Sequence, residues 1–373
     1  MQGVDLSAAG PVAWEGAMSV EQQGATYTAW RIDHSKVDLF APTAGQAPLL
    51  DPASNHSGVR LAFTSDTSKI RLVAQARSDN MACTYDLRCA GKLVATHTVP
   101  AARPIPGGKP WLELDKFLAN DPAAALLAYG QATEAAKARG PAPVHEVVFD
   151  GLDTGAAVAY ELWLPHAATV LVHSLETAGP CTVERTVDRR PRWITHGSSI
   201  THCSEAHSPS RTWPATAAQL ADLHLVSLGF GGQCHLDQAV ARMIRDTPAD
   251  VISLKLGINL HNMTSATHRT FAAMVLGFIQ TVREGHPNTP ILIISPIWAA
   301  WRGACMALTL SRNRSSLPRQ PALSILLMTV LGGGRDGLRR SQSILANGGC
   351  TSDVPNSGGH AEGTEGEFLV HLG

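Results

Sequence analysis

The chain has 373 residues, of which 44% are hydrophobic and 16% charged, so it can bury a large core and form two domains. A formal net charge of -1 gives no reason to expect nucleic acid or an anionic membrane as a partner. No apolar run reaches the roughly 18 residues of a membrane span, and residues 1–5 do not resemble a secretory signal. Seven cysteines without a Cys-x-x-Cys pair favour reduced thiols and a cytoplasmic protein.

The first half of the chain is predicted to be rich in β-strands. Eight short, partly alternating apolar runs have the composition of strands, at 26–32, 59–63, 69–74, 84–88, 92–96, 145–149, 158–164 and 169–173. Their number and spacing predict an all-β sandwich, jelly-roll-like, over residues 1–185, with a hairpin turn at 89–91. An insertion near 101–143 interrupts the sandwich, and its Ala-rich centre, 123–138, predicts a surface helix.

A second region is predicted over residues 190–298, after a boundary rich in Pro, Arg and Asp. Apolar runs that begin near Arg192, Leu225 and Val251 each end in a turn that contains glycine. Helical apolar spacing lies between and after these runs, at 213–221 and 271–282. This alternation predicts a parallel sheet covered by helices, with ligands at the carboxyl ends of the strands.

The three glycine turns carry the residues with catalytic chemistry. They are Gly-Ser-Ser-Ile-Thr at 197–201, Ser-Leu-Gly-Phe-Gly-Gly at 227–232 and Gly-Ile-Asn at 257–259. In this order and spacing they resemble three blocks of the SGNH, or GDSL-type, esterase and lipase superfamily. Ser198 replaces the usual Asp of the first block, and Ser227 replaces the usual Asn of the second. The resemblance implies a three-layer α/β/α domain with a flavodoxin-like parallel sheet.

The resemblance also implies roles for three residues. Ser199 would attack an ester carbonyl, pass its proton to a histidine and form an acyl-enzyme. The Ser199 N–H, the Gly232 N–H and the Asn259 side chain would hold the oxyanion. Each residue has a structural alternative: a helix N-cap for Ser199, an Asx turn for Asn259 and a strand-to-helix turn for Gly232. The ordered set of three favours the catalytic interpretation.

A β-sandwich in front of such a domain is similar to the arrangement in two-domain, carbohydrate-esterase-like members of the superfamily. That similarity implies an acetylated carbohydrate or another small acyl ester as the substrate. A purely structural role for the sandwich is an equal alternative. The resemblance implies no cofactor and no metal.

The C-terminal block of the superfamily, Asp-x-x-His, supplies the acid and the base, and it is not found after residue 296. The nearest match is the segment 351–360. There His360 is the best candidate base and Asp353 its candidate partner, while Val354 occupies the usual base position. A valine cannot move a proton.

The composition changes in the same part of the chain. Residues 285–335 contain no Asp or Glu, whereas arginines accumulate there. Surface helices ordinarily mix both signs of charge. We therefore expect residues 299–373 to form an atypical segment, either disordered or aberrant relative to the family. The alternative function is then a catalytically impaired protein that binds a carbohydrate or an acylated ligand without turnover.

Other histidines near the three blocks are further candidates for the base. They are His196, His202, His207, His235 and His261. His196 and His202 flank Ser199, but nearness in sequence does not align a nitrogen for proton transfer, so structural roles are the simpler expectation. His202, Cys203 and His207 also suggest a zinc site. Their spacing fits no strong zinc motif, and we predict no metal.

Overall fold

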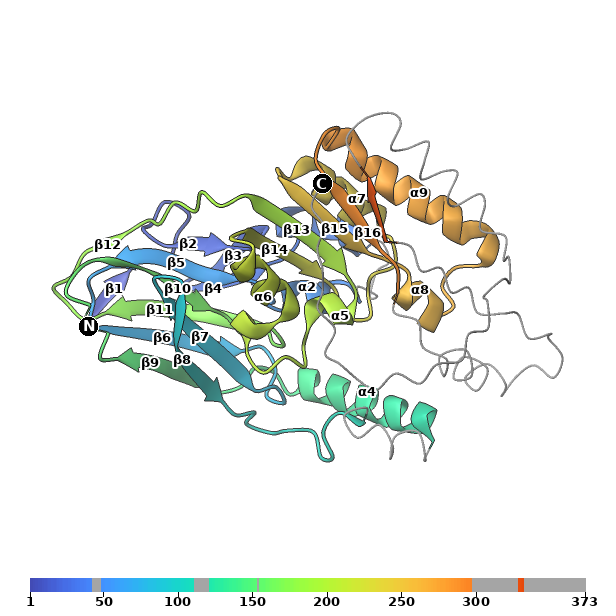
Figure 1. Cartoon of the computed structure of the whole chain (residues 1–373). Helices are drawn as coiled ribbons and strands as arrows, with labels where there is room; N and C mark the ends of the chain where they lie inside the picture. The colour runs from blue at the N-terminus through green and yellow to red at the C-terminus, as the bar shows by residue number, and fades with distance from the viewer. Residues whose placement is uncertain (42–47, 111–120, 153, 297–327, 332–373) are drawn as a thin grey trace, which may run out of the picture.

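The computed structural model describes residues 1–41, 48–110, 121–152, 154–296 and 328–331. Within these ranges, two antiparallel six-stranded sheets precede a five-stranded sheet that is mainly parallel (Figure 1). Of residues 299–373, which we expected to be atypical, the structure describes only β17 (Met328–Leu331). None of the helices in the described ranges is both long enough and apolar enough to cross a membrane.

The first two sheets form the predicted β-sandwich. One has the order β3-β4-β11-β6-β9 with β1 beside β11, and the other has the order β12-β5-β10-β7-β8 with β2 beside β5. The first sheet consists of β1 (Gln2–Val4), β3 (Ser19–Gln23), β4 (Thr26–Trp30), β6 (Lys69–Ala76), β9 (Val144–Asp150) and β11 (Val170–Thr177). The second consists of β2 (Ala13–Glu15), β5 (Arg60–Ser65), β7 (Cys83–Cys89), β8 (Lys92–Val99), β10 (Val158–Trp163) and β12 (Val183–Glu184).

Alternating side chains from both sheets share one hydrophobic core. Strand β6 shows the pattern most clearly, because every second residue is buried. Ile70 and Leu72 of β6 pack in the same cluster as Phe63 of β5 and Tyr160 of β10. Burying a large apolar side chain stabilises a fold by about 1.5–3 kcal/mol, so this shared core is what holds the two sheets face to face.

Two local predictions in the sandwich are confirmed. The strands β7 and β8 pair as a hairpin in which Cys89 lies opposite Lys92. The two residues between them, Ala90 and Gly91, have φ values of 46° and 77°, which is the backbone that a tight two-residue hairpin turn requires. The Ala-rich insertion forms the helix α4 (Pro122–Ala138).

The third sheet has the order β14-β13-β15-β16-β17. Its other strands are β13 (Arg192–Gly197), β14 (His224–Gly229), β15 (Val251–Lys255) and β16 (Ile291–Ile294). The first four strands in this order run parallel, with β13 placed between β14 and β15 as in flavodoxin-like sheets. The prediction of a parallel sheet therefore holds for these four strands. The edge strand β17 is antiparallel to β16, an arrangement common at the edge of such sheets.

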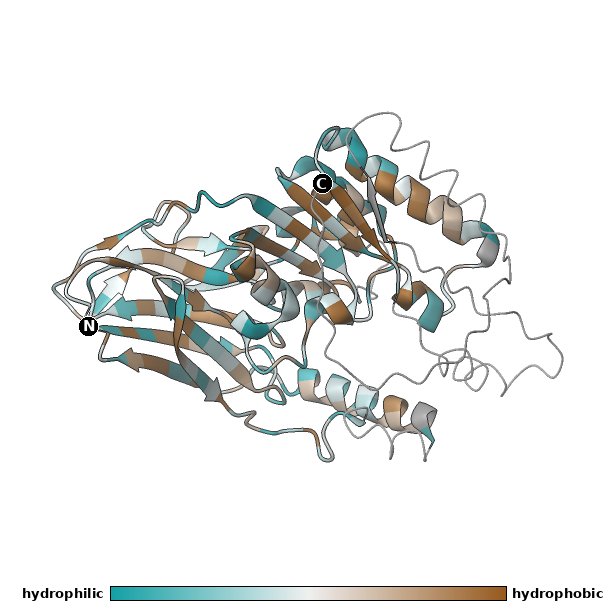
Figure 2. Ribbon diagram, viewed as in Figure 1, coloured by the Kyte–Doolittle hydropathy of each residue, from teal (hydrophilic) through white to brown (hydrophobic). Residues whose placement is uncertain are grey.

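Helices cover both faces of the third sheet. They are η3 (Pro209–Arg211), α5 (Ser199–His202), α6 (Trp213–Leu220), α7 (Gln238–Asp246), α8 (Ile258–Asn262) and α9 (His268–Gly285). On β13, Ile194 packs with residues of α7 and α9, whereas the adjacent Trp193 packs with Ala215 and Ala218 of α6. Neighbouring residues of a strand face opposite sides, so α6 lies on one face and α7 and α9 on the other. Figure 2 shows the hydrophobic strands at the centre of this three-layer α/β/α arrangement.

The sandwich and the α/β region also share apolar clusters. Three short helices connect β4 to β5: η1 (His34–Lys36), α1 (Val37–Phe40) and α2 (Leu50–Ser54). Trp30, Phe40 and Ala53 from this part of the chain lie in the same cluster as Val226 and Leu228 of β14. The first region is therefore packed directly against the strands that end at the candidate site.

Candidate active site

The register of the third sheet brings the three predicted turns to one edge. Gly197 of β13 lies opposite Gly229 of β14 on one side and Lys255 of β15 on the other. Ser199 follows Gly197 by two residues, so it lies between the turns that hold the two predicted oxyanion donors. Figure 1 shows α5 and α8, the helices after β13 and β15, at this same edge of the sheet.

Ser199 is the first residue of α5 and its side chain is exposed. The N-cap of this helix is Ser198, whose hydroxyl oxygen accepts a hydrogen bond from the Ile200 N–H at 3.4 Å. The capping role that a serine commonly plays at this position therefore belongs to Ser198. Among the described residues, no group is hydrogen-bonded to the Ser199 hydroxyl. Its oxygen is open to an incoming molecule.

The turn after β14 lies directly beside Ser199. A Cβ atom added to Gly231 would lie 3.9 Å from the Cβ of Ser199, so a side chain at residue 231 would touch the serine. The Gly231 N–H donates a hydrogen bond to Nδ1 of His202 at 3.2 Å. Gly232 has a φ of 73°, a backbone that residues with a Cβ rarely adopt. The exposed Met263 lies next to it, with its Cε 3.8 Å from the Cβ position of Gly232.

The Asn259 side chain is held in one orientation. It is 5% exposed, and its Oδ1 accepts a hydrogen bond from the Cys234 N–H at 3.0 Å. Its Nδ2 forms no hydrogen bond with any described residue. Among the described residues, the amide nitrogen is therefore a free donor. An Asx turn, the structural alternative, would instead bond a backbone group within the same turn.

The two histidines that flank Ser199 have structural roles. His196 is bonded through Nδ1 to the Leu228 carbonyl oxygen at 2.7 Å, and its Nε2 faces the Cys234 sulfur. His202 accepts from the Gly231 N–H and donates through Nε2 to a backbone carbonyl at 2.8 Å. Burial lowers the pKa of His196 to about 4 and that of His202 well below its usual value. Both rings are neutral and engaged, so neither is placed to take the serine proton.

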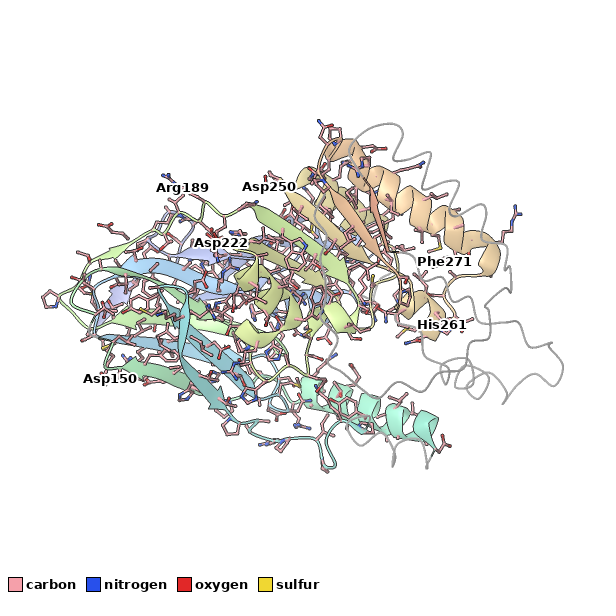
Figure 3. The ribbon with its side chains drawn as sticks, in the orientation of Figure 1. Asp150, Arg189, Asp222, Asp250, His261 and Phe271 are labelled. Carbon is pink, nitrogen blue, oxygen red and sulfur yellow. The ribbon has the colours of Figure 1, made fainter. Side chains whose placement is uncertain are left out.

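The other candidate bases have different surroundings. Both ring nitrogens of His235 are engaged, with the Ser265 hydroxyl at 2.8 Å and the Gly232 carbonyl oxygen at 3.0 Å. His261 is partly exposed on α8, at the edge where the turns meet (Figure 3). No described residue is hydrogen-bonded to its ring. His360 and its candidate partner Asp353 lie outside the described residues.

The possible zinc ligands are not arranged as a metal site. His202 already uses both ring nitrogens, the Cys203 thiol donates to the Ile200 carbonyl oxygen at 3.0 Å, and His207 is exposed. Across the described ranges, no three side chains of His, Cys, Asp or Glu are arranged to hold a metal ion.

Residues of the first region reach behind the site, and the sequence did not reveal them. The Ser57 hydroxyl donates to the His202 carbonyl oxygen at 2.7 Å. The Arg31 guanidinium donates to the carbonyl oxygens of Ser227 and Gly229 at 3.1 and 2.6 Å. For Arg31 a signal was present, because a cation inside an otherwise apolar strand run needs buried partners. Nothing in the sequence around Ser57 distinguishes it.

Comparison with known families fits this geometry. Residues 191–301 match the model of the GDSL-like lipase/acylhydrolase family, a range that contains all three turns. The salicylyl-acyltransferase SsfX3 from a tetracycline biosynthetic pathway has a similar structure, with a TM-score of 0.62 and 27% identity. The match covers 78% of this chain and 74% of that one. Residues 191–301 therefore form an SGNH hydrolase domain.

Two further structures resemble this SGNH hydrolase. A GDSL-like lipase candidate from Bacteroides ovatus has 18% identity and a TM-score of 0.51, over 76% of this chain and 72% of that one. A family two carbohydrate esterase from Cellvibrio japonicus has 10% identity and a TM-score of 0.49, over 81% of each chain. No curated protein sequence matches significantly. The predicted superfamily and its fold are confirmed, and it is a superfamily of ester-cleaving hydrolases.

A close backbone contact at this site predicts the effect of Gly229→Ala. A Cβ at residue 229 would lie 2.3 Å from the His202 nitrogen and 2.4 Å from the Thr201 carbonyl carbon, both in the backbone of α5. The helix that carries Ser199 would have to move, so we expect a loss of roughly 1–3 kcal/mol in unfolding free energy. Gly277→Ala in α9 is the matched control, because its added Cβ would meet nothing within 4 Å. Urea unfolding of both variants measures the difference, and equal stability of the two would contradict the prediction.

Proposed function

We propose that this SGNH hydrolase is a serine esterase that cleaves a small carboxylic ester through an acyl-enzyme on Ser199. The observation that carries the proposal is the oriented amide of Asn259, whose Oδ1 is bound by the Cys234 N–H while Nδ2 remains a free donor. Ser199 is exposed at the same edge of the sheet. The Ser199 N–H, the Gly232 N–H and the Asn259 amide then stabilise the oxyanion of each tetrahedral intermediate. Water releases the acyl group in the second half of the reaction.

The serine proton needs an acceptor during the attack. Three histidines of the described site use both ring nitrogens in other contacts: His196, His202 and His235. This leaves the exposed His207, His261 on α8 and His360 in the C-terminal segment as the candidate bases, with Asp353 as the partner of His360. Substituting each histidine with alanine and measuring kcat between pH 6 and 9 identifies the base.

We propose a small acyl group, acetyl or aromatic, as the part of the substrate that binds Ser199. SsfX3, the similar structure of highest identity reported above, is named for the transfer of a salicylyl group. The apolar Met263 side chain lies against Gly232 and offers a surface for such a group. An acetylated carbohydrate is a candidate for the complete ester, and p-nitrophenyl acetate, p-nitrophenyl benzoate and acetylated xylo-oligosaccharides form a direct comparison.

Hydrolysis of p-nitrophenyl acetate by the wild-type protein and by Ser199→Ala tests the proposal. We expect Ser199→Ala to remove the activity, and a fluorophosphonate to label Ser199 in the wild-type protein. Ser204→Ala is the matched control, since Ser204 follows α5 by two residues and its hydroxyl is hydrogen-bonded, among the described residues, only to Glu205 at 3.2 Å. Hydrolysis that survives in Ser199→Ala at the wild-type rate would exclude the mechanism.

A second candidate function follows from the neutral, engaged histidines beside Ser199. If no base is supplied, the site binds an acylated ligand or a carbohydrate without turnover. This alternative predicts that the wild-type protein and Ser199→Ala are equally inactive, and that calorimetry detects acetylated oligosaccharide binding to both. It also predicts no labelling of Ser199 by the fluorophosphonate, because labelling needs an activated hydroxyl.

A further inference from the structure

Arg31 is a fully buried cation whose hydrogen-bond partners are backbone carbonyl groups. The residue follows β4 in the first region and is 0% exposed. Its Nε donates to the Asn55 carbonyl oxygen at 2.6 Å, and its Nη2 donates to the Pro52 carbonyl oxygen. Its Nη1 donates to the carbonyl oxygens of Ser227 and Gly229 at 3.1 and 2.6 Å. Within the described ranges, no carboxylate forms an ion pair with it.

A buried guanidinium without an anion is costly, because water solvates the charge better than a protein interior does. Burial lowers the pKa of Arg31 to about 9, so the group still carries its proton at neutral pH. Its four carbonyl contacts and the ring of Phe230, 5.2 Å from the guanidinium carbon, offset part of this cost. A cation in such a place is better explained by a specific task than by stability alone.

The place of Arg31 suggests what that task is. Its Nη1 alone donates to the carbonyl oxygens of both Ser227 and Gly229, two of the last three residues of β14 before the turn that holds Gly232. From the other side, His202 holds the next part of the same turn through the Gly231 N–H. The three residues 229–231 are thus fixed at both ends, by Arg31 at Gly229 and by His202 at Gly231.

The side chain of Ser227 does not hold the turn by hydrogen bonding to any described residue, so the contacts of Arg31 with the backbone matter more. The Ser227 hydroxyl is buried and has no hydrogen-bond partner in the part of the chain that the structure describes. The family block has Asn at this position, whose larger side chain offers more hydrogen-bonding groups than a hydroxyl. The Ser227 side chain therefore contributes no hydrogen bond that fixes the turn, among the described residues. Arg31 supplies its contacts through the backbone of the same strand instead.

We propose that Arg31 is a positioning residue for the oxyanion hole. Its guanidinium holds the carbonyl groups at the end of β14, and through them it keeps the Gly232 N–H directed toward the oxyanion. This role rests on the proposed function of Ser199 and Gly232, and it makes the first region a part of the catalytic apparatus. Its charge also acts at the site, because it disfavours protonation of both His196 and His202, the histidines beside Ser199.

Arg60 offers a matched control for Arg31. It is 1% exposed and lies over the ring of Trp163, and it donates to the Leu225 carbonyl oxygen at 3.3 Å, in the same strand β14. Leu225 is the second residue of that strand and precedes Gly232 by seven residues, whereas the two carbonyls bound by Arg31 precede it by five and three. Unlike Arg31, Arg60 lies 3.4 Å from a carboxylate, that of Glu161.

The test compares Arg31→Lys with Arg60→Lys in the full chain. Lysine keeps the charge but has a single nitrogen, so it cannot make the four carbonyl contacts that Nε, Nη1 and Nη2 of Arg31 make together. For p-nitrophenyl acetate we expect Arg31→Lys to lower kcat at least tenfold with KM within twofold, and Arg60→Lys to keep both within twofold. Binding of a trifluoromethyl ketone, which forms an oxyanion on Ser199, should weaken by the same factor as kcat in Arg31→Lys only. Equal effects of the two variants, or an unchanged kcat in Arg31→Lys, would overturn the assignment.

Amide hydrogen exchange keeps this test separate from the esterase proposal. We expect the Gly231 and Gly232 amides to exchange at least tenfold faster in Arg31→Lys than in Arg60→Lys at matched global stability. If the wild-type protein shows no hydrolysis that depends on Ser199, the esterase proposal fails, and this exchange rate decides the positioning role of Arg31. Unchanged exchange in Arg31→Lys would exclude that role. If Arg31→Lys does not fold, Arg31→Gln, which keeps amide donors for the carbonyls, is measured by the same criteria.

Discussion

Lowering the pH from 7 to 5.5 is expected to reduce the free energy of unfolding by roughly 5 kcal/mol. Four histidines cause the loss, because all are buried and neutral in the folded protein: His56, His166, His196 and His202. Burial lowers the pKa of His56 to about 3, that of His166 and His196 to about 4, and that of His202 well below its usual value. An unfolded histidine takes up a proton near pH 6.5.

The sign follows from which state binds the protons. Between pH 6.5 and about 4 the unfolded chain binds protons that the folded protein excludes, so each step downward in pH favours unfolding. The stability that depends on these four neutral rings is present above pH 6.5 and is lost as the pH falls toward their folded pKa values. Each ring contributes about 1.4 kcal/mol per pH unit in this window. Because domains are stable by only about 5–15 kcal/mol, acid unfolding should begin above pH 5.

Urea unfolding at pH 7.0, 6.25 and 5.5 measures the effect before most carboxylates titrate. His196→Asn should lessen the loss by roughly a quarter, because its amide nitrogen is able to bond the Leu228 carbonyl oxygen but does not titrate. A wild-type stability that stays constant from pH 7.0 to 5.5 would refute the explanation.

Much of the fold could be predicted because its pattern is local. The alternation in β6 and the apolar runs of β13, β14 and β15 each specify a strand without knowledge of its neighbours. The strands β1, β2, β3 and β12 escaped prediction because they are only two to five residues long and lie at the margins of their sheets. β3 and β12 are edge strands, and β1 and β2 pair with a sheet from outside its main order. Pairing with an established strand, which no local pattern encodes, makes them strands.

The candidate site was predictable only in part, because some of its features follow from local sequence and others depend on tertiary contacts. Ser199, Gly232 and Asn259 were found because each occupies a turn directly after a strand, and the sheet brings such turns together. The roles of His196 and His202 depend on burial and on tertiary partners, so their nearness to Ser199 in sequence carried no information about proton transfer. His360 lies outside the described residues and stays a prediction.

Asn259→Ala is expected to lower kcat for ester hydrolysis by roughly 10²–10³-fold, about 2.7–4 kcal/mol, which is the usual effect of removing one oxyanion donor. KM should change little, because the oxyanion exists only in the tetrahedral intermediates and not in the bound ester. Steady-state kinetics with p-nitrophenyl acetate measures both values. Asn262→Ala, an exposed position at the end of the same helix, is the matched control and should keep kcat within twofold.

Asn259→Asp separates the catalytic role from the structural one. Alanine leaves the buried Cys234 N–H without its acceptor, which costs about 1–3 kcal/mol of stability in addition to the lost donor. Aspartate still accepts that hydrogen bond, so the fold is retained, but it puts a negative oxygen where the oxyanion needs a donor. We therefore expect Asn259→Asp to be the more stable variant and the less active one. If Asn259→Asp is stable and keeps kcat within threefold of the wild-type protein, Asn259 is only a structural support for the turn after β14.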